Sequence, residues 1–171
     1  MRTYRHARPL HRIVRRTAAT RPMAKVYGVI QQPLDELVHR LTRGRTTASS
    51  WLAGVEITML TTTGARSGQA RTRPVLGLPD GDGVLVIASN FGRPRNPGWY
   101  HNLRANPNAT IVLAGVRREV VARELDGPER ERAYQRGEEI YPGFTHYCRW
   151  ASNRRIPVLR LEPRSTQSSG P

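Results

Sequence analysis

The chain has 171 residues, of which 37% are hydrophobic and 24% are charged, and its formal net charge is +15. This length and composition are typical of one globular domain with its own core, and no apolar run approaches the roughly 20 residues of a membrane-spanning helix. The charge favours an anionic partner, which could be nucleic acid, acidic lipid, or a phosphorylated or carboxylated small molecule.

The first 22 residues contain seven arginines and no acidic residue. We interpret residues 1–22 as a basic arm outside the core, disordered or weakly helical. A helix is conceivable because Leu10, Ile13 and Val14 have helical spacing, and such a helix could touch an acidic membrane surface. The predicted domain then covers residues 23–163, and the polar residues 164–171 form a disordered tail.

The apolar periodicity predicts the elements of the domain in chain order. A helix begins at Pro33 and ends near Gly44, because leucine and valine recur with helical spacing from position 34 to position 41. The period then changes to two, which predicts strands near 56–63, 71–78, 84–89, 109–113, 117–124 and 156–162. Three further helices are predicted at 97–104, 128–141 and 144–153, the first with Pro97 at its first helical position.

Six short strands that mostly follow one another along the chain cannot hide both edges of an open sheet, whereas a closed barrel has no edges. We therefore predict a mainly β fold with flanking helices, of the α+β class. It is a small antiparallel barrel with helices packed outside it and closing one end.

Residues 61–75, TTTGARSGQARTRPV, form the first candidate site. Gly64 and Gly68 bracket a turn whose backbone amides can point outward and cradle an anion. Three arginines accompany this turn, at positions 66, 71 and 73. They suit a phosphate or several carboxylates, because a charge-assisted hydrogen bond contributes about 1.5–3 kcal/mol. An exposed hairpin with solvated arginines explains the same spacing equally well.

Residues 86–106 form the second candidate site. A strand ends in VIASN (86–90), and a helix that carries Trp99, Tyr100 and Asn102 follows an irregular loop. Polar groups at such a junction often line small-molecule pockets. The ring of Trp99 offers a flat surface, although a core position is the simpler interpretation of this residue.

The third stretch is YPGFTHYCRW at 141–150, in which three aromatic residues recur with helical spacing, a pattern more typical of a core than of a pocket. A nucleophile made of Cys148 and His146 is not expected, since adjacent residues of a helix point apart. The single cysteine also excludes an intrachain disulfide and fits a reducing compartment, so we expect a cytoplasmic protein. The histidines lack zinc-ligand spacing, and no metal is expected.

Three motifs, TTTGARSGQARTRPV, VIASN and NPGWYHNLRANP, in this order and spacing, resemble the deazaflavin-dependent nitroreductase and quinone reductase family, which uses coenzyme F420. The resemblance covers about residues 34–163. It implies a split, FMN-binding-like β-barrel, which agrees with the predicted barrel. It also implies an oxidoreductase that transfers a hydride from reduced F420 to an electron-poor acceptor such as a quinone or a nitroaromatic.

The resemblance further implies which residues bind the cofactor. The anionic phosphate and polyglutamate end falls on Arg66, Ser67, Arg71, Thr72, Arg73, Pro74, Val75 and Leu76. The deazaflavin ring falls on Ile87, Ala88, Ser89, Asn90, Trp99, Tyr100, His101 and Asn102. Tyr141, Phe144 and Tyr147 cover the substrate side, and the candidate catalytic hydrogen-bond donors are Ser89, Tyr141 and Tyr147. No nucleophile is expected, because the cofactor carries the hydride chemistry.

The sequence departs from the family pattern at two positions. Ala65 stands where members frequently have a basic residue, and Arg73 could compensate. Phe144 lacks the hydroxyl that some members have there, which favours quinone reduction over nitroimidazole activation. Two alternatives remain, an FMN-binding oxidoreductase on the same barrel and a basic nucleic-acid-binding module, although no recognition helix is evident. A homodimer and a peripheral contact with the inner face of the cell membrane are also left open.

Overall fold

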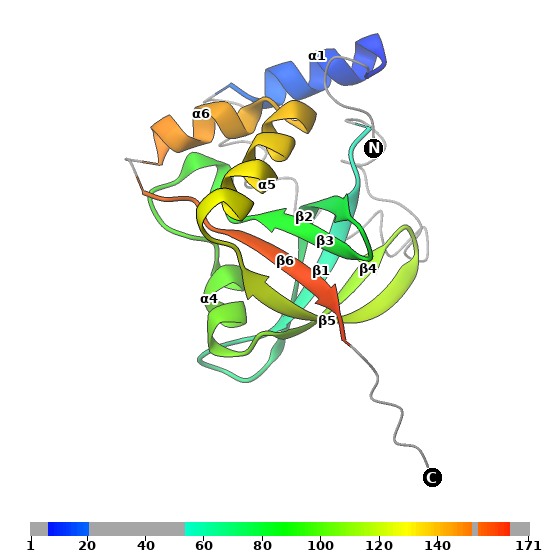
Figure 1. Ribbon diagram of the computed structural model, residues 1–171, viewed down its shortest axis with the longest axis vertical. Coiled ribbons are helices and arrows are strands. Elements are labelled where there is room, and N and C mark those ends of the chain that lie inside the picture. Colours follow the sequence, from blue (N-terminus) through cyan, green and yellow to red (C-terminus); the bar gives the residue numbers. More distant parts are fainter. Residues whose placement is uncertain (1–6, 21–53, 152–153, 165–171) are drawn as a thin grey trace.

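Figure 1 shows the computed structural model of the chain, which describes residues 7–20, 54–151 and 154–164. These residues contain the strands β1 (Ile57–Thr63), β2 (Ala70–Asp80), β3 (Gly83–Ile87), β4 (Asn108–Leu113), β5 (Val116–Glu124) and β6 (Val158–Pro163). They also contain the helices α1 (Pro9–Ala18), α4 (Gly98–Ala105), α5 (Gly127–Ile140) and α6 (Gly143–Trp150), and the short 3-10 helix η2 (Asn90–Gly92). The helix predicted at 33–44, and residues 165–171 of the predicted tail, lie outside the described residues.

The strands form a closed barrel in the order β1-β2-β3-β6-β5-β4, and every neighbouring pair is antiparallel. Two meanders, β1 to β3 and β4 to β6, are joined where β3 pairs with β6 and β1 pairs with β4. Because each strand has a neighbour on both sides, the sheet has no open edge. The predicted fold class, a small antiparallel barrel with flanking helices, is confirmed.

One apolar cluster fills the inside of the barrel, and every strand contributes to it. Its strand residues are Leu60, Val75, Val84, Val86, Ala88, Ile111, Val120, Leu159 and Leu161, with Ala88 directly after β3. Side chains alternate between the two faces of a strand, so these positions define the inward face. Helix α4 adds Trp99, Tyr100 and Leu103 and so closes one end of the barrel.

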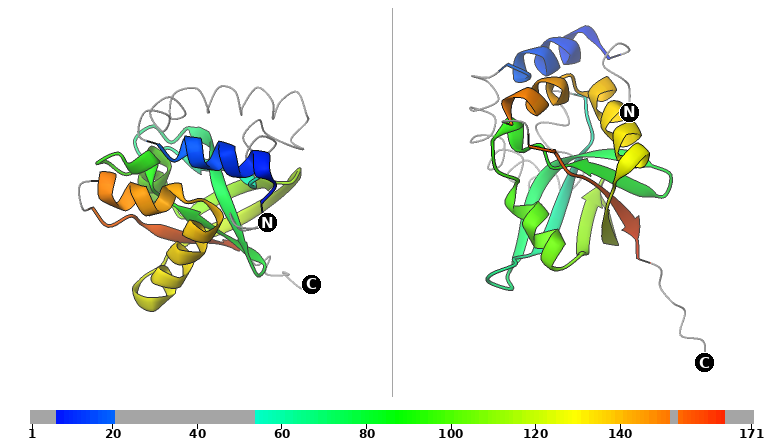
Figure 2. Two further views of the ribbon diagram at one scale, coloured as in Figure 1. Left: turned by 90° about the horizontal axis from the view of Figure 1, so that it is seen from above. Right: turned by 60° about the vertical axis from the view of Figure 1, so that its left-hand side comes forward.

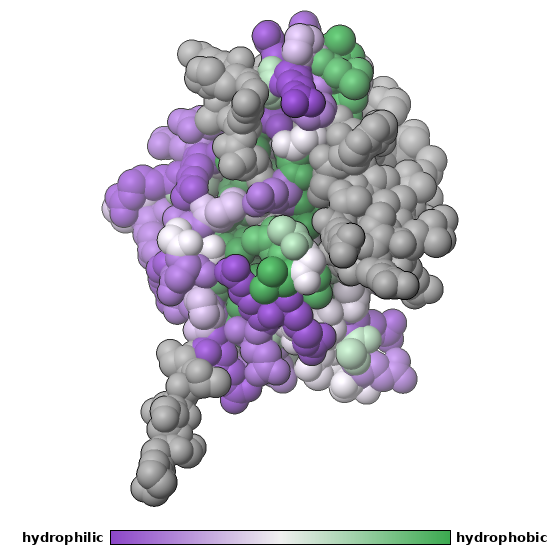
Figure 3. Space-filling model, turned by 90° about the vertical axis from the view of Figure 1, so that its right-hand side faces the viewer, coloured by the Kyte–Doolittle hydropathy of each residue, from purple (hydrophilic) through white to green (hydrophobic). Residues whose placement is uncertain are grey.

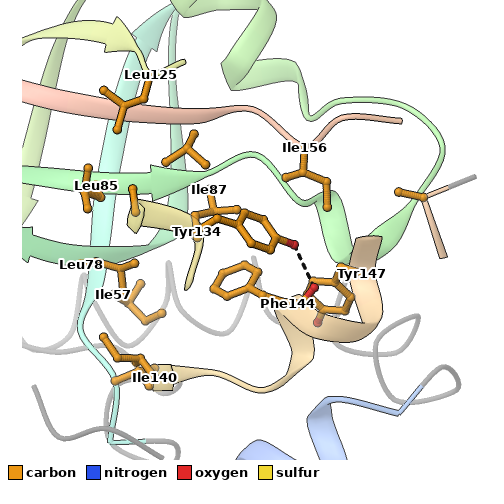
Figure 4. Packing of buried hydrophobic residues seen from close by; sticks show 14 residues of the cluster. Ile57, Leu78, Leu85, Ile87, Leu125, Tyr134, Ile140, Phe144, Tyr147 and Ile156 are labelled. Atoms are coloured by element: carbon orange, nitrogen blue, oxygen red, sulfur yellow. Dashed lines mark hydrogen bonds between the residues drawn. The ribbon is translucent and has the colours of Figure 1, made fainter. Parts of the chain in front are cut away.

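A second apolar cluster, the outer cluster, lies between the outward face of the sheet and the helices α5 and α6 (Figure 4). The sheet contributes residues such as Ile57, Leu85 and Ile87, and the two helices contribute aromatic side chains. Gly137 lets α5 approach β3 closely, because a Cβ at this position would lie 2.4 Å from Ile87 Cδ1. Figure 2 shows α1 beside α6, at the end of the molecule away from α4.

The structure corrects the predicted boundaries on both sides of the loop that follows β3. β3 ends at Ile87 and not at residue 89, because Ser89 already has helical backbone angles, with φ of −68° and ψ of −33°. Asn90 and Phe91, which follow, have positive φ of 50° and 56°. Pro97 is the N-cap of α4, with an extended ψ of 152°, and is not its first helical residue. The chain between β3 and α4 is therefore a loop with an irregular backbone.

The described part of residues 1–22 contains the helix α1, which packs on α6. Arg15 is only 1% exposed, and its guanidinium donates hydrogen bonds to Ile140 O (2.9 Å) and Gly54 O (2.8 Å). It thus connects α1 to the C-terminal end of α5 and to the segment before β1. The opposite face of α1 exposes Leu10 (64%) and Ile13 (61%). Among the described residues, no helix combines the length and apolarity that crossing a membrane requires.

Candidate active site

The turn between β1 and β2, residues 64–69, is held from two directions. Within the turn, Gly64 N donates to Gln69 O and Gly68 N to Gly64 O, both at 2.8 Å. From α4, Asn102 accepts a hydrogen bond from Ala65 N through Oδ1 and donates one to Thr62 Oγ1 through Nδ2, each at 3.0 Å. The TTTG motif and the NPGWYHNL motif are therefore parts of one structure, and Asn102 joins them.

The same turn has fewer outward-pointing amides than its sequence suggests. The amides of Gly64, Ala65 and Gly68 have acceptors inside the protein, and Gln69 N donates to Ser67 Oγ at 3.4 Å. The amides of residues 66 and 67 have no acceptor among the described residues. The side chains at 66, 67 and 71 are exposed to solvent. An anion at this turn would meet two guanidinium groups, a serine hydroxyl and two amides.

The predicted binding run on β2 is divided between the two faces of the sheet. Val75 belongs to the cluster inside the barrel, so Arg71 and Arg73, at alternate positions, point to that same side. Thr72, Pro74 and Leu76 point outward. Thr72 Oγ1 lies 2.8 Å from Thr61 Oγ1 on β1, and Leu76 packs on the outer cluster. The side chain of Val75 is only 8% exposed and contacts the barrel core.

The aromatic residues of the third motif meet at one end of the outer cluster. Phe144 contacts three tyrosine rings there, and its ring centroid lies 5.5 Å from that of Tyr141, 6.0 Å from that of Tyr147 and 6.1 Å from that of Tyr134. Figure 4 shows the rings of Tyr134 and Phe144 beside Ile87 of β3, with Tyr147 farther along α6. The hydroxyls of Tyr141 and Tyr147 lie 3.0 Å apart. Tyr147 is 2% exposed whereas Tyr141 is half-buried, so Tyr141 is the less buried member of the pair.

Burial, together with the neighbouring hydroxyl of Tyr141, raises the pKa of Tyr147 far above its ordinary value. Burial and a hydrogen bond from Cys148 Sγ (3.0 Å) likewise raise the pKa of Tyr134, whose hydroxyl donates to Phe144 O at 2.9 Å. Both hydroxyls therefore stay protonated over the whole physiological range. Each can donate a hydrogen bond and neither can serve as a base.

These shifts predict how stability depends on alkaline pH. The folded protein keeps the Tyr147 proton at a pH where the unfolded chain, with a pKa of about 10, has lost it. Stability is thus complete below about pH 9 and falls above about pH 10, by about 1.4 kcal/mol per pH unit for each such tyrosine. In Tyr147→Phe, the fall of the unfolding free energy with pH above about pH 10 should be less steep by about 1.4 kcal/mol per pH unit. Urea unfolding between about pH 8 and pH 11 tests this, and curves that stay parallel would contradict it.

Ser89 lies at the start of the loop after β3 and is 9% exposed. Its amide donates to Ile87 O at 2.8 Å and its carbonyl accepts from Gly92 N at 3.0 Å. Its hydroxyl has no hydrogen-bond partner among the described residues. Of its predicted neighbours, Ile87 belongs to the outer cluster and Ala88 to the cluster inside the barrel. Ser89 therefore sits where the two clusters meet.

The predicted ring-binding residues of α4 mostly have structural contacts. Trp99 (8% exposed) and Tyr100 (5% exposed) belong to the barrel core, and Tyr100 OH donates to Glu124 Oε2 at 3.0 Å. His101 is exposed and lies edge-on to the Tyr100 ring. The structure thus brings Asn102 to the β1–β2 turn, but it separates Trp99 from the tyrosines of α6.

One residue that the sequence analysis missed is Arg154, which follows α6 and reaches back to the loop after β3. Its side chain donates to Ser89 O (2.7 Å), Arg93 O (3.0 Å) and Asn96 Oδ1 (2.6 Å). These partners lie 58 to 65 residues earlier in the chain, and no motif surrounds Arg154. The described residues contain no group of three acidic, histidine or cysteine side chains placed to bind a metal ion.

A closed antiparallel barrel of six strands, with helices on its outer face and across one end, places this protein in the class of small split-barrel proteins. Among solved structures, an F420-H2 dependent reductase is 36% identical, with a TM-score of 0.58 over 62% of this chain and 93% of that one. A second structure, described as a domain-swapped dimer, is 33% identical, with a TM-score of 0.61 over 74% of this chain and 95% of the other.

The sequence relatives specify the family. An F420H(2)-dependent quinone reductase of Mycobacterium tuberculosis is 36% identical over 141 residues, which are 80% of this chain and 93% of that protein. The model of the F420H(2)-dependent quinone reductase family matches residues 34–163. The chain belongs to this family, which confirms the predicted oxidoreductase class. The FMN-binding and nucleic-acid-binding alternatives are not favoured.

Proposed function

We propose that this protein reduces quinones with F420H2 on the outward face of its barrel, between the β1–β2 turn and the tyrosines of α6. The observation that carries the proposal is that Leu76 and Tyr141 both pack on the outer cluster. Leu76 lies on the strand that leaves the arginine-bearing turn, and Tyr141 is the less buried tyrosine of the hydrogen-bonded pair. The outward face of β2 therefore leads from an anion-binding end to a hydrogen-bonding end.

The turn's donor set fits the acidic end of F420. Two exposed guanidinium groups, at Arg66 and Arg71, lie with two backbone amides that lack acceptors among the described residues, and such donors suit phosphate and carboxylate oxygens. Arg66 and Ser67 would hold this end from the turn, and Arg71 would reach it from the inward side at the very start of β2. Thr72, Pro74 and Leu76 would contact the cofactor along the outward face of the strand. When bound, F420H2 supplies the hydride.

The protein's own part in the reaction is to position the acceptor and to donate hydrogen bonds. Tyr141 would donate to the acceptor oxygen, on which negative charge develops, and Tyr147 would orient the Tyr141 hydroxyl from a distance of 3.0 Å. The hydroxyl of Ser89 is a second donor. The buried apolar surface of Ile87 and Phe144 would keep water away from the reacting atoms.

The direct test mixes the purified protein with F420H2 and menadione and follows the return of the visible absorbance of oxidised F420. We expect turnover that depends on the protein, and no flavin in the protein as purified. Absence of F420 binding in a titration would refute the proposal. Release of FMN on heating would favour the FMN-binding alternative.

We also propose that the protein is cytoplasmic and makes a peripheral contact with an acidic membrane surface. It would take a lipophilic quinone from that membrane. Leu10 and Ile13 project from α1 between arginines, and Figure 3 shows apolar atoms at the end of the molecule where Figure 1 places α1. Exposed leucine and isoleucine side chains together with arginines suit an anionic bilayer interface.

Flotation with vesicles that contain anionic lipid checks the membrane contact. Leu10→Ser combined with Ile13→Ser should lower the bound fraction about tenfold, because each lost apolar side chain removes about 1 kcal/mol or more of burial energy. Val116→Ser, at a 50% exposed position on the barrel, is the matched control. Equal binding of all variants would argue against the contact. A homodimer, suggested by the solved relative described as a domain-swapped dimer, can be checked by light scattering on the same samples.

A further inference from the structure

The loop between β3 and α4, residues 88–97, contains three consecutive residues in the left-handed region. Asn90, Phe91 and Gly92 have φ of 50°, 56° and 72°. Glycine adopts this conformation freely, but asparagine and phenylalanine do so at a cost, which persists only where the surroundings hold the backbone. The contacts of this loop therefore identify what holds it.

Arg154 provides most of these contacts. Its Nη2 donates to Ser89 O at 2.7 Å and to Ala88 O at 3.3 Å, its Nε to Arg93 O at 3.0 Å, and its Nη1 to Asn96 Oδ1 at 2.6 Å. The side chain thus joins both ends of the loop. No carboxylate among the described residues pairs with it. A planar guanidinium can donate to all four acceptors at once, whereas a lysine ammonium cannot match this geometry.

The loop in turn contacts the aromatic residues of α6. The ring of Phe91 lies edge-on to that of Tyr147, with centroids 6.3 Å apart. Gly92 passes so close to α6 that a Cβ at this position would lie 2.9 Å from Trp150 Cβ and 3.2 Å from Tyr147 Cα. Ser89, whose carbonyl Arg154 binds, is therefore fixed relative to the tyrosine pair.

We propose that Arg154 is a positioning residue for the reaction: by binding the loop from Ala88 to Asn96, it sets the Ser89 hydroxyl against the acceptor side of the site. This inference rests on the proposed function. Arg154 itself lies behind the loop and acts through Ser89, without contact to the acceptor. Its loss should lower turnover and leave the binding of the anionic end of F420 unchanged.

A double-mutant cycle tests whether Arg154 acts through Ser89. We expect Arg154→Met and Ser89→Ala each to lower kcat with menadione about tenfold, with the KM for F420H2 within about threefold of the wild-type value. The double variant should be no slower than the slower single variant. Arg154→Lys keeps the charge but loses most of the hydrogen bonds, so its kcat should be close to that of Arg154→Met. Effects that multiply in the double variant, or an unaffected kcat in Arg154→Met, would overturn the proposal.

Amide hydrogen exchange of the protein without cofactor gives a readout that does not depend on activity. Gly92 N and Arg93 N donate within the loop, to Ser89 O and Asn90 O. In Arg154→Met, these amides should exchange at least about tenfold faster. Arg155→Met is the matched control, because the neighbouring exposed Arg155 pairs with Asp126 and not with the loop.

The two measurements separate the two possible failures. If the wild-type protein reduced no quinone, the proposed function would fail, and the exchange data would still decide whether Arg154 orders the loop. Unchanged exchange in Arg154→Met would refute the positioning role even in an active enzyme.

Discussion

Replacing Arg66 and Arg71 together with glutamate should weaken the binding of oxidised F420 by at least about 100-fold. Each arginine is expected to make a charge-assisted hydrogen bond to the phosphate or the polyglutamate tail, worth about 1.5–3 kcal/mol. Losing two such bonds costs about 3–6 kcal/mol, and every 1.4 kcal/mol is a factor of ten in Kd. Isothermal titration calorimetry at two salt concentrations measures the effect, and the salt dependence of Kd should diminish in the variant.

The control for this variant has the same change in charge elsewhere on the barrel. Arg117 and Arg118 are exposed on β5, next to the β4–β5 turn, and neither belongs to the proposed site. Replacing both with glutamate should change Kd by less than about threefold, through the long-range field of the protein alone. If the two double variants bound F420 equally well, the turn would not be the anion-binding end, and the proposed orientation of the cofactor would be wrong.

Phe144→Ala should lower the free energy of unfolding by about 3–5 kcal/mol, the usual range for removing a buried phenylalanine ring. Phe144 is 4% exposed, and three tyrosine rings of the outer cluster surround it. Its removal leaves a cavity between α5 and α6 that the rigid barrel face beneath it cannot fill. Urea unfolding, with the midpoint and the slope fitted together, gives the value.

Thr145→Ala is the matched control for the core variant, since Thr145 is the next residue of α6 and is exposed. It should change the free energy of unfolding by no more than about 0.5 kcal/mol. A small effect of Phe144→Ala would mean that the ring faces an open site and not a packed core. Comparing the menadione turnover of Phe144→Ala with that of Thr145→Ala would show whether activity requires the aromatic end of the outer cluster to stay rigid.

Much of the fold could be predicted from local patterns. The period-two segments located all six strands to within two residues at most boundaries, and β-branched and aliphatic residues at alternate positions favour strands whatever lies around them. The closed barrel could be predicted because six short strands cannot hide both edges of an open sheet, whereas a barrel has no edges. The family was evident from the three combined motifs, and the first and third of them prove to be in contact through Asn102.

The sequence did not show in the same way how the predicted site residues are divided between the two faces of the sheet. The run from Arg71 to Leu76 is continuous in sequence, yet the pleat of β2 sends alternate side chains to opposite faces of the sheet. For Trp99, the sequence alone favoured a core position and the family resemblance implied a ring-binding one, and the structure places its side chain in the cluster inside the barrel. The spacing of residues close together in the chain does not show which face of a closed sheet packs inside the barrel and which lies outside it.

What the sequence determined by itself was therefore the set of strands, the family and the arginine-bearing turn, because these depend on residues close together in the chain. Only the tertiary structure decided which of those residues share a surface, which tyrosine of the pair is less buried, and which arginine binds the loop after β3. The contacts of Arg154 span up to 66 residues, and those of Arg15 span 125. Such contacts form only when the barrel closes and brings distant carbonyl groups together, so no local pattern encodes them.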